Sequence, residues 1–242
     1  MKQIYLYYVF NLVCFCASAQ TTFYYEDFRF NAGRRGFTGQ VVQQGGQVLN
    51  EINKIVSDIP DASDSAFSDA DNRPLHRIPQ NEPREQRAIV TYGTNATTST
   101  NFPLEVYTVF TTVDVTAANP LIPATDAYRY ASFWTQRKYG EGDLATISIL
   151  VSTDYKGNAT TATWTTLPLV SGKIATTADK AKYVKAIVDL SNYVKSPSGN
   201  TVTLALHYQG ADTPYSGTKR NGAFSISDVQ FFSQPKKITK SN

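Results

Sequence analysis

Cysteine, methionine and histidine are scarce in this chain. Its 242 residues include two cysteines, one methionine and two histidines. Cys14, Cys16 and Met1 all lie among the first twenty residues, so the rest of the chain contains neither cysteine nor methionine. This excludes disulfide scaffolds, thiolate metal sites and cysteine nucleophiles from that part of the chain. The two histidines, His76 and His207, are isolated from one another in the sequence, which argues against a zinc site.

The chain also has little net charge and lacks any apolar run that could span a membrane. Its formal net charge is +3 with 18% charged residues, too balanced for a nucleic-acid binder. Hydrophobic residues make up 41% and aromatic residues 12%, which is too many for a disordered protein. The apolar run Ile4–Cys16 has 13 residues, whereas a membrane-spanning helix needs about 20. We therefore expect a folded protein that does not itself span a membrane.

The first residues have the pattern of an export signal. A short basic segment, Met1–Gln3, precedes the apolar run, and Ala17–Ala19 supplies the small residues that signal peptidase requires. Neither cysteine is preceded by the small residues of a lipoprotein signal. We predict a signal peptide over residues 1–19, with Gln20 as the new N-terminus. The expected location is the cell surface, at the extracellular face of an outer membrane, or the periplasm.

Short runs rich in threonine, tyrosine, valine and isoleucine predict a β protein. Turn residues such as glycine, asparagine and proline separate these runs. About eight short strands with frequent turns predict an all-β fold, an antiparallel β-sandwich of jelly-roll type, forming one domain over residues 20–242. The expected strands are Thr22–Phe30, Ala88–Tyr92, Leu104–Val115, Tyr128–Gln136, Ala145–Ser152, Tyr183–Asp189, Thr201–Tyr208 and Ala223–Phe232.

The strand Thr201–Tyr208 alternates between apolar and polar residues, which predicts one core face and one polar face. The expected core residues are Val202, Leu204, Leu206 and Tyr208, and the expected polar face consists of Thr201, Thr203, Ala205 and His207. After Tyr183–Asp189 we expect a single turn rather than a continuing helix, because the segment is rich in β-branched residues.

A polar segment with four prolines, residues 58–87, predicts a long irregular excursion from the sandwich. Within it, Asp64-Ser65-Ala66 matches a short O-glycosylation signal, which makes Ser65 a candidate modification site. The basic tail, residues 233–242, is interpreted as a solvated terminus.

The order of features from Tyr128 onward resembles a known family. The features are Ala131–Trp134, Gly140–Asp143, Ile149–Gly157, Ala162–Leu167, Val188–Tyr193, Leu204–Tyr208 and Phe224–Val229, with Glu26–Phe28 as a matching start. They are similar to the secreted jelly-roll modules of Bacteroidota called cleaved-adhesin or choice-of-anchor-J domains, which have a galactose-binding-like sandwich. The run V-S-T-D-Y-x-G with the following W-T-x-L is its most specific part. The match covers about the last 115 residues plus the first strand.

This resemblance implies a non-catalytic, adhesin-like or carbohydrate-associated domain. Galactose-binding-like sandwiches often hold a structural calcium ion between the first and last strands, and Glu26, Asp27 and Asp228 occupy the matching positions. The alternative is that Glu26 and Asp27 pair with nearby arginines or face water. Family members are often parts of larger proteins, but no anchor or sorting domain is recognisable after the last expected strand.

Catalytic patterns are weak in this sequence. Jelly-roll glycosidases place two carboxylates on one strand face, and no Glu-x-Asp-x-Glu run occurs here. A serine hydrolase would need His76 or His207 beside a serine and an aspartate. His207 lies beside Tyr208 in a strand, and we interpret it as a solvated or hydrogen-bonded residue. We expect no enzyme, and a divergent hydrolase is the third of three functional readings.

Sugar binding would require aromatic platforms with polar neighbours. Trp134, Tyr155, Trp164 and Tyr215 are considered, but Trp134 lies in the middle of a strand and is expected to be structural. The remaining candidates are Tyr155, Trp164 and Tyr215, although Trp164 is also expected to pack under the turn Ser152–Gly157. The first functional reading is an accessory subunit docked on an outer-membrane or cell-surface protein, with residues 58–87 as the docking arm. The second reading is a soluble carbohydrate-binding module with a glycan as its partner.

Overall fold

The computed structural model describes residues 20–26, 38–44, 54–57, 87–91, 95–96, 102–138, 145–179, 183–194, 201–214 and 222–238. The predicted signal peptide, Ser65, Asp27, Tyr215 and the excursion up to residue 86 lie outside these residues. Within them, none of the helices has the length and hydrophobicity that crossing a membrane would require.

The described residues form strands almost throughout. The strands are β1 (Thr21–Glu26), β2 (Thr38–Gln44), β3 (Lys54–Ser57), β4 (Arg87–Thr91), β5 (Asn95–Ala96), β6 (Phe102–Asp114), β7 (Tyr128–Lys138), β8 (Thr146–Ser152), β9 (Thr165–Thr166), β10 (Leu169–Gly172), β11 (Val184–Asp189), β12 (Thr201–Pro214) and β13 (Ala223–Gln234). Two short 3-10 turns, η2 (Thr177–Asp179) and η3 (Ser191–Tyr193), flank β11. η3 is the single turn expected after residue 189.

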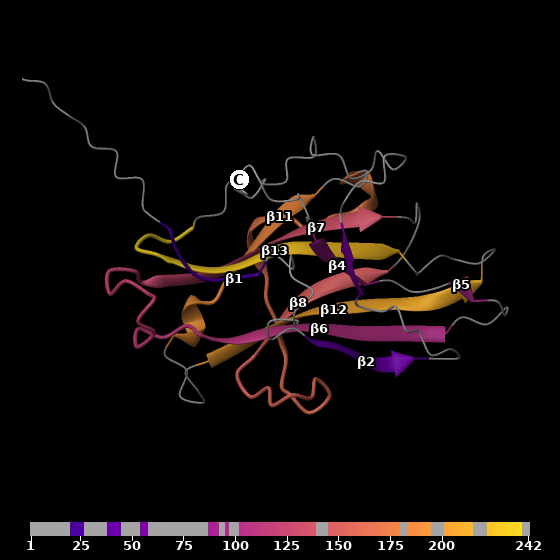
Figure 1. The fold of residues 1–242 in the computed structure, drawn as a ribbon, viewed down its shortest axis with the longest axis horizontal. Coiled ribbons are helices and arrows are strands. Elements are labelled where there is room, and N and C mark those ends of the chain that lie inside the picture. The colour runs from indigo at the N-terminus through magenta and orange to yellow at the C-terminus, as the bar shows by residue number, and fades with distance from the viewer. Residues whose placement is uncertain are drawn as a thin grey trace, which may run out of the picture.

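These strands form two stacked sheets, which confirms the predicted all-β sandwich (Figure 1). The seven-stranded sheet has the order β10-β11-β7-β13-β4-β3, and β1 also pairs with β13. The six-stranded sheet has the order β2-β6-β12-β8-β9, and β5 also pairs with β12. The strand pairs are antiparallel except for β5 with β12. This arrangement is consistent with a jelly roll.

Strand β13 lies in the interior of the seven-stranded sheet and pairs with three other strands. On one side it pairs with β7 along its length. On the other side its first half, Phe224–Ile226, pairs with β4, and its second half, residues 229–233, pairs with β1. The strand continues to Gln234, two residues into the segment expected to be a tail. Beyond it, the backbone N–H of Ile238 donates to the hydroxyl of Tyr130, so the start of the tail is attached to the sheet.

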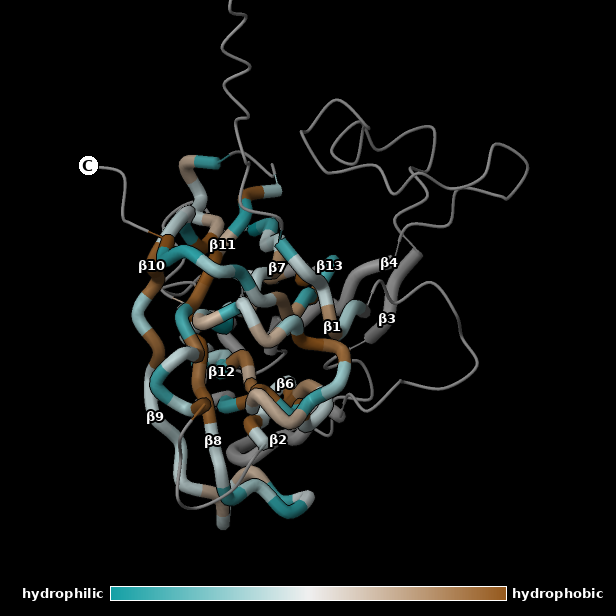
Figure 2. Tube along the Cα trace, turned by 90° about the vertical axis from the view of Figure 1, so that its left-hand side faces the viewer, coloured by the Kyte–Doolittle hydropathy of each residue, from teal (hydrophilic) through white to brown (hydrophobic). Residues whose placement is uncertain are grey.

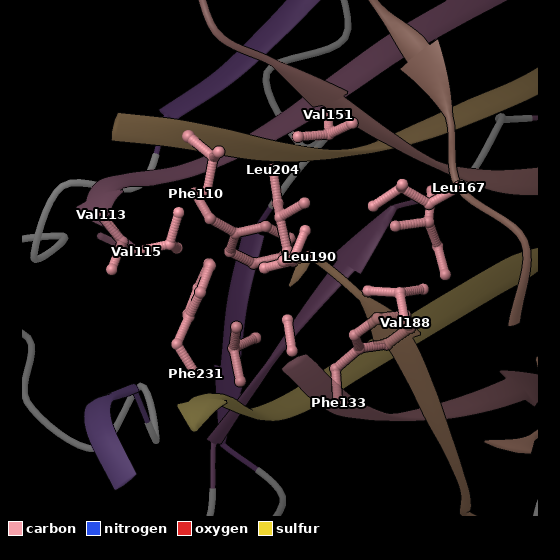
Figure 3. Packing of buried hydrophobic residues seen from close by; sticks show 14 of the residues in the cluster. Phe110, Val113, Val115, Phe133, Val151, Leu167, Val188, Leu190, Leu204 and Phe231 are labelled. Carbon is pink, nitrogen blue, oxygen red and sulfur yellow. The ribbon is translucent and has the colours of Figure 1, made fainter. Parts of the chain in front are cut away.

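The hydrophobic core lies between the two sheets (Figures 2 and 3). Phe110 and Leu204 of the six-stranded sheet pack there with Phe133, Val188 and Phe231 of the seven-stranded sheet. Each of these side chains alternates with a neighbour that points away from the core, as the period of a strand requires. The predicted core residues of β12 are confirmed: Val202, Leu204, Leu206 and Tyr208 are all buried.

Two residues on the predicted polar face of β12 are buried, although they point away from the core between the sheets. Thr203 is 2% exposed and Ala205 is fully buried. Ala205 packs with Val109, Leu150 and Ala159 in a second apolar cluster on the outer face of the six-stranded sheet. The cluster includes Ala159 because the loop between β8 and β9 folds back over this face, and in Figure 1 that loop lies on the side away from the seven-stranded sheet. The alternation of apolar and polar residues along one strand does not indicate whether a loop will cover the outer face of that strand.

A buried arginine closes one end of the sandwich. The side chain of Arg129 is 2% exposed. Its Nε donates to the carbonyl of Val115 at 3.0 Å, and its Nη1 donates to the carbonyl of Asp126 at 2.6 Å and to that of Tyr128 at 3.2 Å. The Asp126 carboxylate in turn accepts a 2.7 Å hydrogen bond from the hydroxyl of Ser233. Burial lowers the pKa of Arg129, and the charge of Asp126 opposes this shift.

Candidate functional site

Aromatic residues gather on the outer face of the six-stranded sheet. We call Tyr107, Tyr155, Trp164 and His207 the aromatic surface. Tyr107 of β6 and His207 of β12 are direct cross-strand partners, and their rings stack with centroids 4.4 Å apart at 25°. The ring of Trp164 lies 5.9 Å from that of Tyr107 and 5.8 Å from that of Tyr155. All four residues are partly buried and partly exposed to solvent.

A carboxylate borders this surface. Nε2 of His207 lies 2.6 Å from Oε1 of Glu105, and the hydroxyl of Tyr107 donates a longer, 3.4 Å hydrogen bond to the same oxygen. The imidazole is 11% exposed and the carboxylate 27%. Burial raises the pKa of Tyr107, and the charge of Glu105 adds to the shift. His207 is therefore hydrogen-bonded, as expected from the sequence.

The loop between β8 and β9 brings Tyr155 and Trp164 to the sheet. Oδ1 of Asp154 accepts hydrogen bonds from the hydroxyl of Ser152 at 2.7 Å and from the backbone N–H of Thr163 at 2.8 Å, which joins the two ends of the loop. The bonds from Ser152 and then Thr163 lower the pKa of Asp154. The indole N–H of Trp164 donates to the carbonyl of Ala159 at 2.8 Å.

The structure brings together two of the three predicted sugar-binding residues, Tyr155 and Trp164. Trp164 packs against the turn that carries Tyr155, as the sequence motif implied. Sequence reasoning missed Tyr107, Glu105 and the ring contact of His207 with them. Glu105 and Tyr107 are two residues apart in a predicted strand, which places them on one face. Only the register of β6 with β12, which a single sequence does not reveal, brings that face beside His207.

Chemically, the aromatic surface can offer ring faces to an apolar partner and hydrogen bonds at its edge. The hydrogen-bond groups are the Tyr107 hydroxyl, the His207 imidazole and the Glu105 carboxylate. Among the described residues, no group of three His, Cys, Asp or Glu side chains is placed to hold a metal ion. The surface thus has the composition of a binding site with several aromatic groups and few polar ones.

Asp228, one of the three predicted calcium ligands, lies on the other sheet. It adopts a left-handed conformation with φ of 53°, where the register of β13 with β7 shifts. Its side chain is 6% exposed, and its Oδ1 accepts a 2.6 Å hydrogen bond from the hydroxyl of Tyr25. The charge of Asp228 also acts on Lys185, where it opposes the lowering of the pKa of Lys185 by burial.

Of the other two predicted ligands, Glu26 is described only by its backbone, which pairs with Val229, and Asp27 lies outside the described residues. Glu26 thus ends the strand that runs beside Asp228. The calcium hypothesis stays a prediction.

No protein-family model matches this chain, and no curated protein matches it. Several solved structures are similar to it. The K1 cleaved adhesin domain of Lys-gingipain from Porphyromonas gingivalis W83 is 12% identical, with a TM-score of 0.46 over 88% of this chain and 97% of that one. The CBM22-1 xylan-binding domain of Xyn10C from Paenibacillus barcinonensis is 14% identical, with a TM-score of 0.42 over 93% and 99%. The K3 cleaved adhesin domain of Lys-gingipain is 13% identical, with a TM-score of 0.33 over 74% and 90%.

Two of these three structures are cleaved adhesin domains, the type of module that the sequence resembles. Their identities and TM-scores are low, so no ligand or partner is transferred from them to this chain.

Proposed function

We propose that this protein is a non-catalytic binding module that holds a carbohydrate against the aromatic surface. The observation that carries the proposal is the convergence of Tyr107, Tyr155, Trp164 and His207, from two strands and one loop, on one face of a sheet. The apolar face of a sugar ring packs well on an aromatic side chain, because both surfaces are flat and weakly hydrated.

The polar edge of the surface supports the same function. Glu105 can accept hydrogen bonds from sugar hydroxyls, and it is held in place by His207. Such charge-assisted hydrogen bonds provide orientation and specificity where ring stacking alone provides mainly affinity. Asp154 and the Trp164 indole fix the loop that carries Tyr155, so less conformational freedom is lost when a ligand binds.

Affinity electrophoresis in native gels that contain single polysaccharides tests this function. We expect the protein to be retarded by at least one polysaccharide, and the Tyr155→Ala variant to lose most of that retardation. Tyr128→Ala is the matched control, because Tyr128 is a half-buried tyrosine at the start of β7 in the other sheet. Equal retardation of the wild type and Tyr155→Ala, or none in any gel, would overturn the proposal.

Docking on an outer-membrane or cell-surface protein is a separate prediction about partners. It depends on the excursion at residues 58–87 and on export through the signal peptide at residues 1–19. A pull-down of tagged protein from gently solubilised host membranes, compared with a variant lacking residues 58–86, tests it. We expect a stoichiometric membrane partner with the wild type only, and unchanged recovery with the deletion variant would contradict this role of the excursion.

The hypothesis that the protein is a divergent hydrolase can be tested directly. Turnover of model substrates that disappears in His207→Ala would replace the binding-module proposal with an enzymatic one. We expect no turnover in either protein, since the described contacts of His207 are Glu105 and Tyr107, and neither supplies a serine nucleophile.

A further inference from the structure

The outer face of the seven-stranded sheet carries a second group of polar and aromatic side chains. We call Tyr25, Ser132, Trp134, Lys185 and Asp228 the Trp134 patch. Three of them point away from the core because their neighbours in sequence point into it. The core contains Ala131 and Phe133, which flank Ser132. Phe133 also precedes Trp134 in the chain. Lys185 is followed by Ala186, which belongs to the core as well.

The strand register brings the patch together across four neighbouring strands. Lys185 of β11 is the cross-strand partner of Trp134 in β7. On the other side of β7, Ser227 of β13 pairs with Trp134, and Asp228 follows directly in the chain. Gln230 of β13 pairs with both Ser132 and Tyr25, which connects β1 to the group. Tyr25 and Asp228 therefore share one surface although 203 positions separate them in the sequence.

The charged members of the patch are only partly solvated, and Asp228 is also held in place. Asp228 is held by Tyr25 and by its left-handed backbone, which an aspartate tolerates better than most residues. Lys185 and Trp134 are half-buried. Burial lowers the pKa of Lys185, and the charge of Asp228 acts against that change. The patch thus presents one cationic and one anionic group beside an indole ring.

One member of the patch, Ser132, has a buried hydroxyl with unused hydrogen-bonding capacity. Oγ of Ser132 is inaccessible to solvent, and it has no hydrogen-bond partner among the described residues. Buried polar groups in folded proteins nearly always have a partner, so each exception requires an explanation. A hydroxyl-rich ligand that displaces the side chains covering Ser132 would provide that partner.

We propose that the Trp134 patch is a second ligand site, separate from the aromatic surface, which binds one neutral pyranose residue. The indole of Trp134 stacks on the apolar face of the sugar. The Lys185 ammonium donates to a hydroxyl oxygen, and the Asp228 carboxylate accepts from a hydroxyl of the same ring. Because the two charges are opposite, the site favours a neutral polyol over an acidic sugar. This site does not depend on the proposed function of the aromatic surface.

The tryptophan content of the chain makes the two sites separable. The chain contains two tryptophans, and Trp134 belongs to the patch while Trp164 belongs to the aromatic surface. In Trp164→Phe, indole emission reports only on the patch, and in Trp134→Phe it reports only on the aromatic surface. Each single-tryptophan chain is titrated with cellohexaose, xylohexaose, mannohexaose, maltohexaose and, as the acidic probe, polygalacturonate. Thermal unfolding of each variant verifies that it is folded.

We expect a saturable change in Trp134 emission with at least one of the four neutral oligosaccharides. Adding Lys185→Met, which keeps most of the side-chain volume, should weaken that binding by about tenfold or more, because a hydrogen bond to a charged group is lost. Asp228→Asn, which tolerates the left-handed backbone, should do the same. If one of these variants does not fold, the other provides the same test.

Three results would overturn the second site. The first is an unchanged Trp134 emission with every probe, whatever Trp164 shows. The second is a Trp134 response that both Lys185→Met and Asp228→Asn leave intact. The third is a response to polygalacturonate alone. Failure of the proposed function is recognised separately, because it would leave the Trp164 emission unchanged.

Discussion

Nε of Arg129 donates a 3.0 Å hydrogen bond to the backbone carbonyl of Val115, which joins the start of β7 to the end of β6. The same guanidinium bonds to the carbonyls of Asp126 and Tyr128. It thereby provides hydrogen bonds to three backbone acceptors at this end of the sandwich.

Arg129→Met should therefore destabilise the protein strongly. We expect a loss of about 3–5 kcal/mol, because the substitution removes the guanidinium charge that lies near the buried Asp126 carboxylate. Urea unfolding measures this loss. Lys236→Met, at an exposed position, is the control and should change stability by less than about 0.5 kcal/mol. A loss below about 1 kcal/mol for Arg129→Met would mean that water replaces the guanidinium at little cost.

Gly172 is a second position where the fold allows little change. It ends β10 with φ of 70°, and a Cβ atom built there would overlap the carbonyl oxygen of Lys185. Gly157 has a similar φ of 95°, but a Cβ atom there would meet open space. Both alanine variants bear the cost of the left-handed backbone, about 1–2 kcal/mol. Gly172→Ala should lose about 1–3 kcal/mol more, since the strands β10 and β11 must separate. Equal melting temperatures for the two variants would contradict this.

The stabilisation that Asp154 gives to the loop carrying Tyr155 should decrease in acid. Hydrogen bonds from Ser152 and Thr163 hold the pKa of Asp154 below its ordinary value, so the folded state favours the charged carboxylate. The stabilisation is complete above the pKa of Asp154 in the unfolded chain, and it is lost as pH falls through the lower folded value. We expect the melting-temperature difference between the wild type and Asp154→Asn to be constant near neutral pH and to shrink in acid. A difference that does not change down to acid pH would show that these hydrogen bonds do not depend on the charge.

Calcium binding at Glu26, Asp27 and Asp228 predicts a higher melting temperature in excess calcium than in EDTA. The Asp228→Asn variant should then show no such difference. Equal melting temperatures of the wild type in the two solutions would remove the calcium hypothesis. Asp228 would then interact only with groups of the protein, such as the Tyr25 hydroxyl, which donates a hydrogen bond to it, and the charge of Lys185.

Patterns within single strands predicted much of this fold. The strand Thr201–Tyr208 was expected from its alternation, and β12 contains it and continues to Pro214. The short strands β9 and β10 were not expected, because two to four residues of alternating or threonine-rich sequence carry too little pattern. The apolar face of β12 was recognisable, whereas burial of Ala205 depends on a loop that only the folded chain places there.

The candidate sites were predicted less completely for a related reason. Tyr155 and Trp164 are close in sequence and share a motif, so their proximity was foreseeable. His207 and Glu105 are 102 positions apart, and their contact depends on the register of β6 with β12. The same holds for Lys185 and Trp134, whose neighbourhood follows from the pairing of β11 with β7. Register between distant strands depends on the whole core and cannot be obtained from one strand.

The position of β13 has a consequence for the order in which the protein can fold. This last strand lies in the interior of its sheet, where β7 occupies one side and β1 and β4 share the other. Until residues 223–234 have left the ribosome, β1 lacks β13, the strand with which it pairs among the described residues. Folding must then close loops of about two hundred residues, which makes it slow compared with that of proteins dominated by local contacts. Among the described strands, β1 thus stays unpaired until β13 has been synthesised, and the complete sandwich can form only after β13 is available.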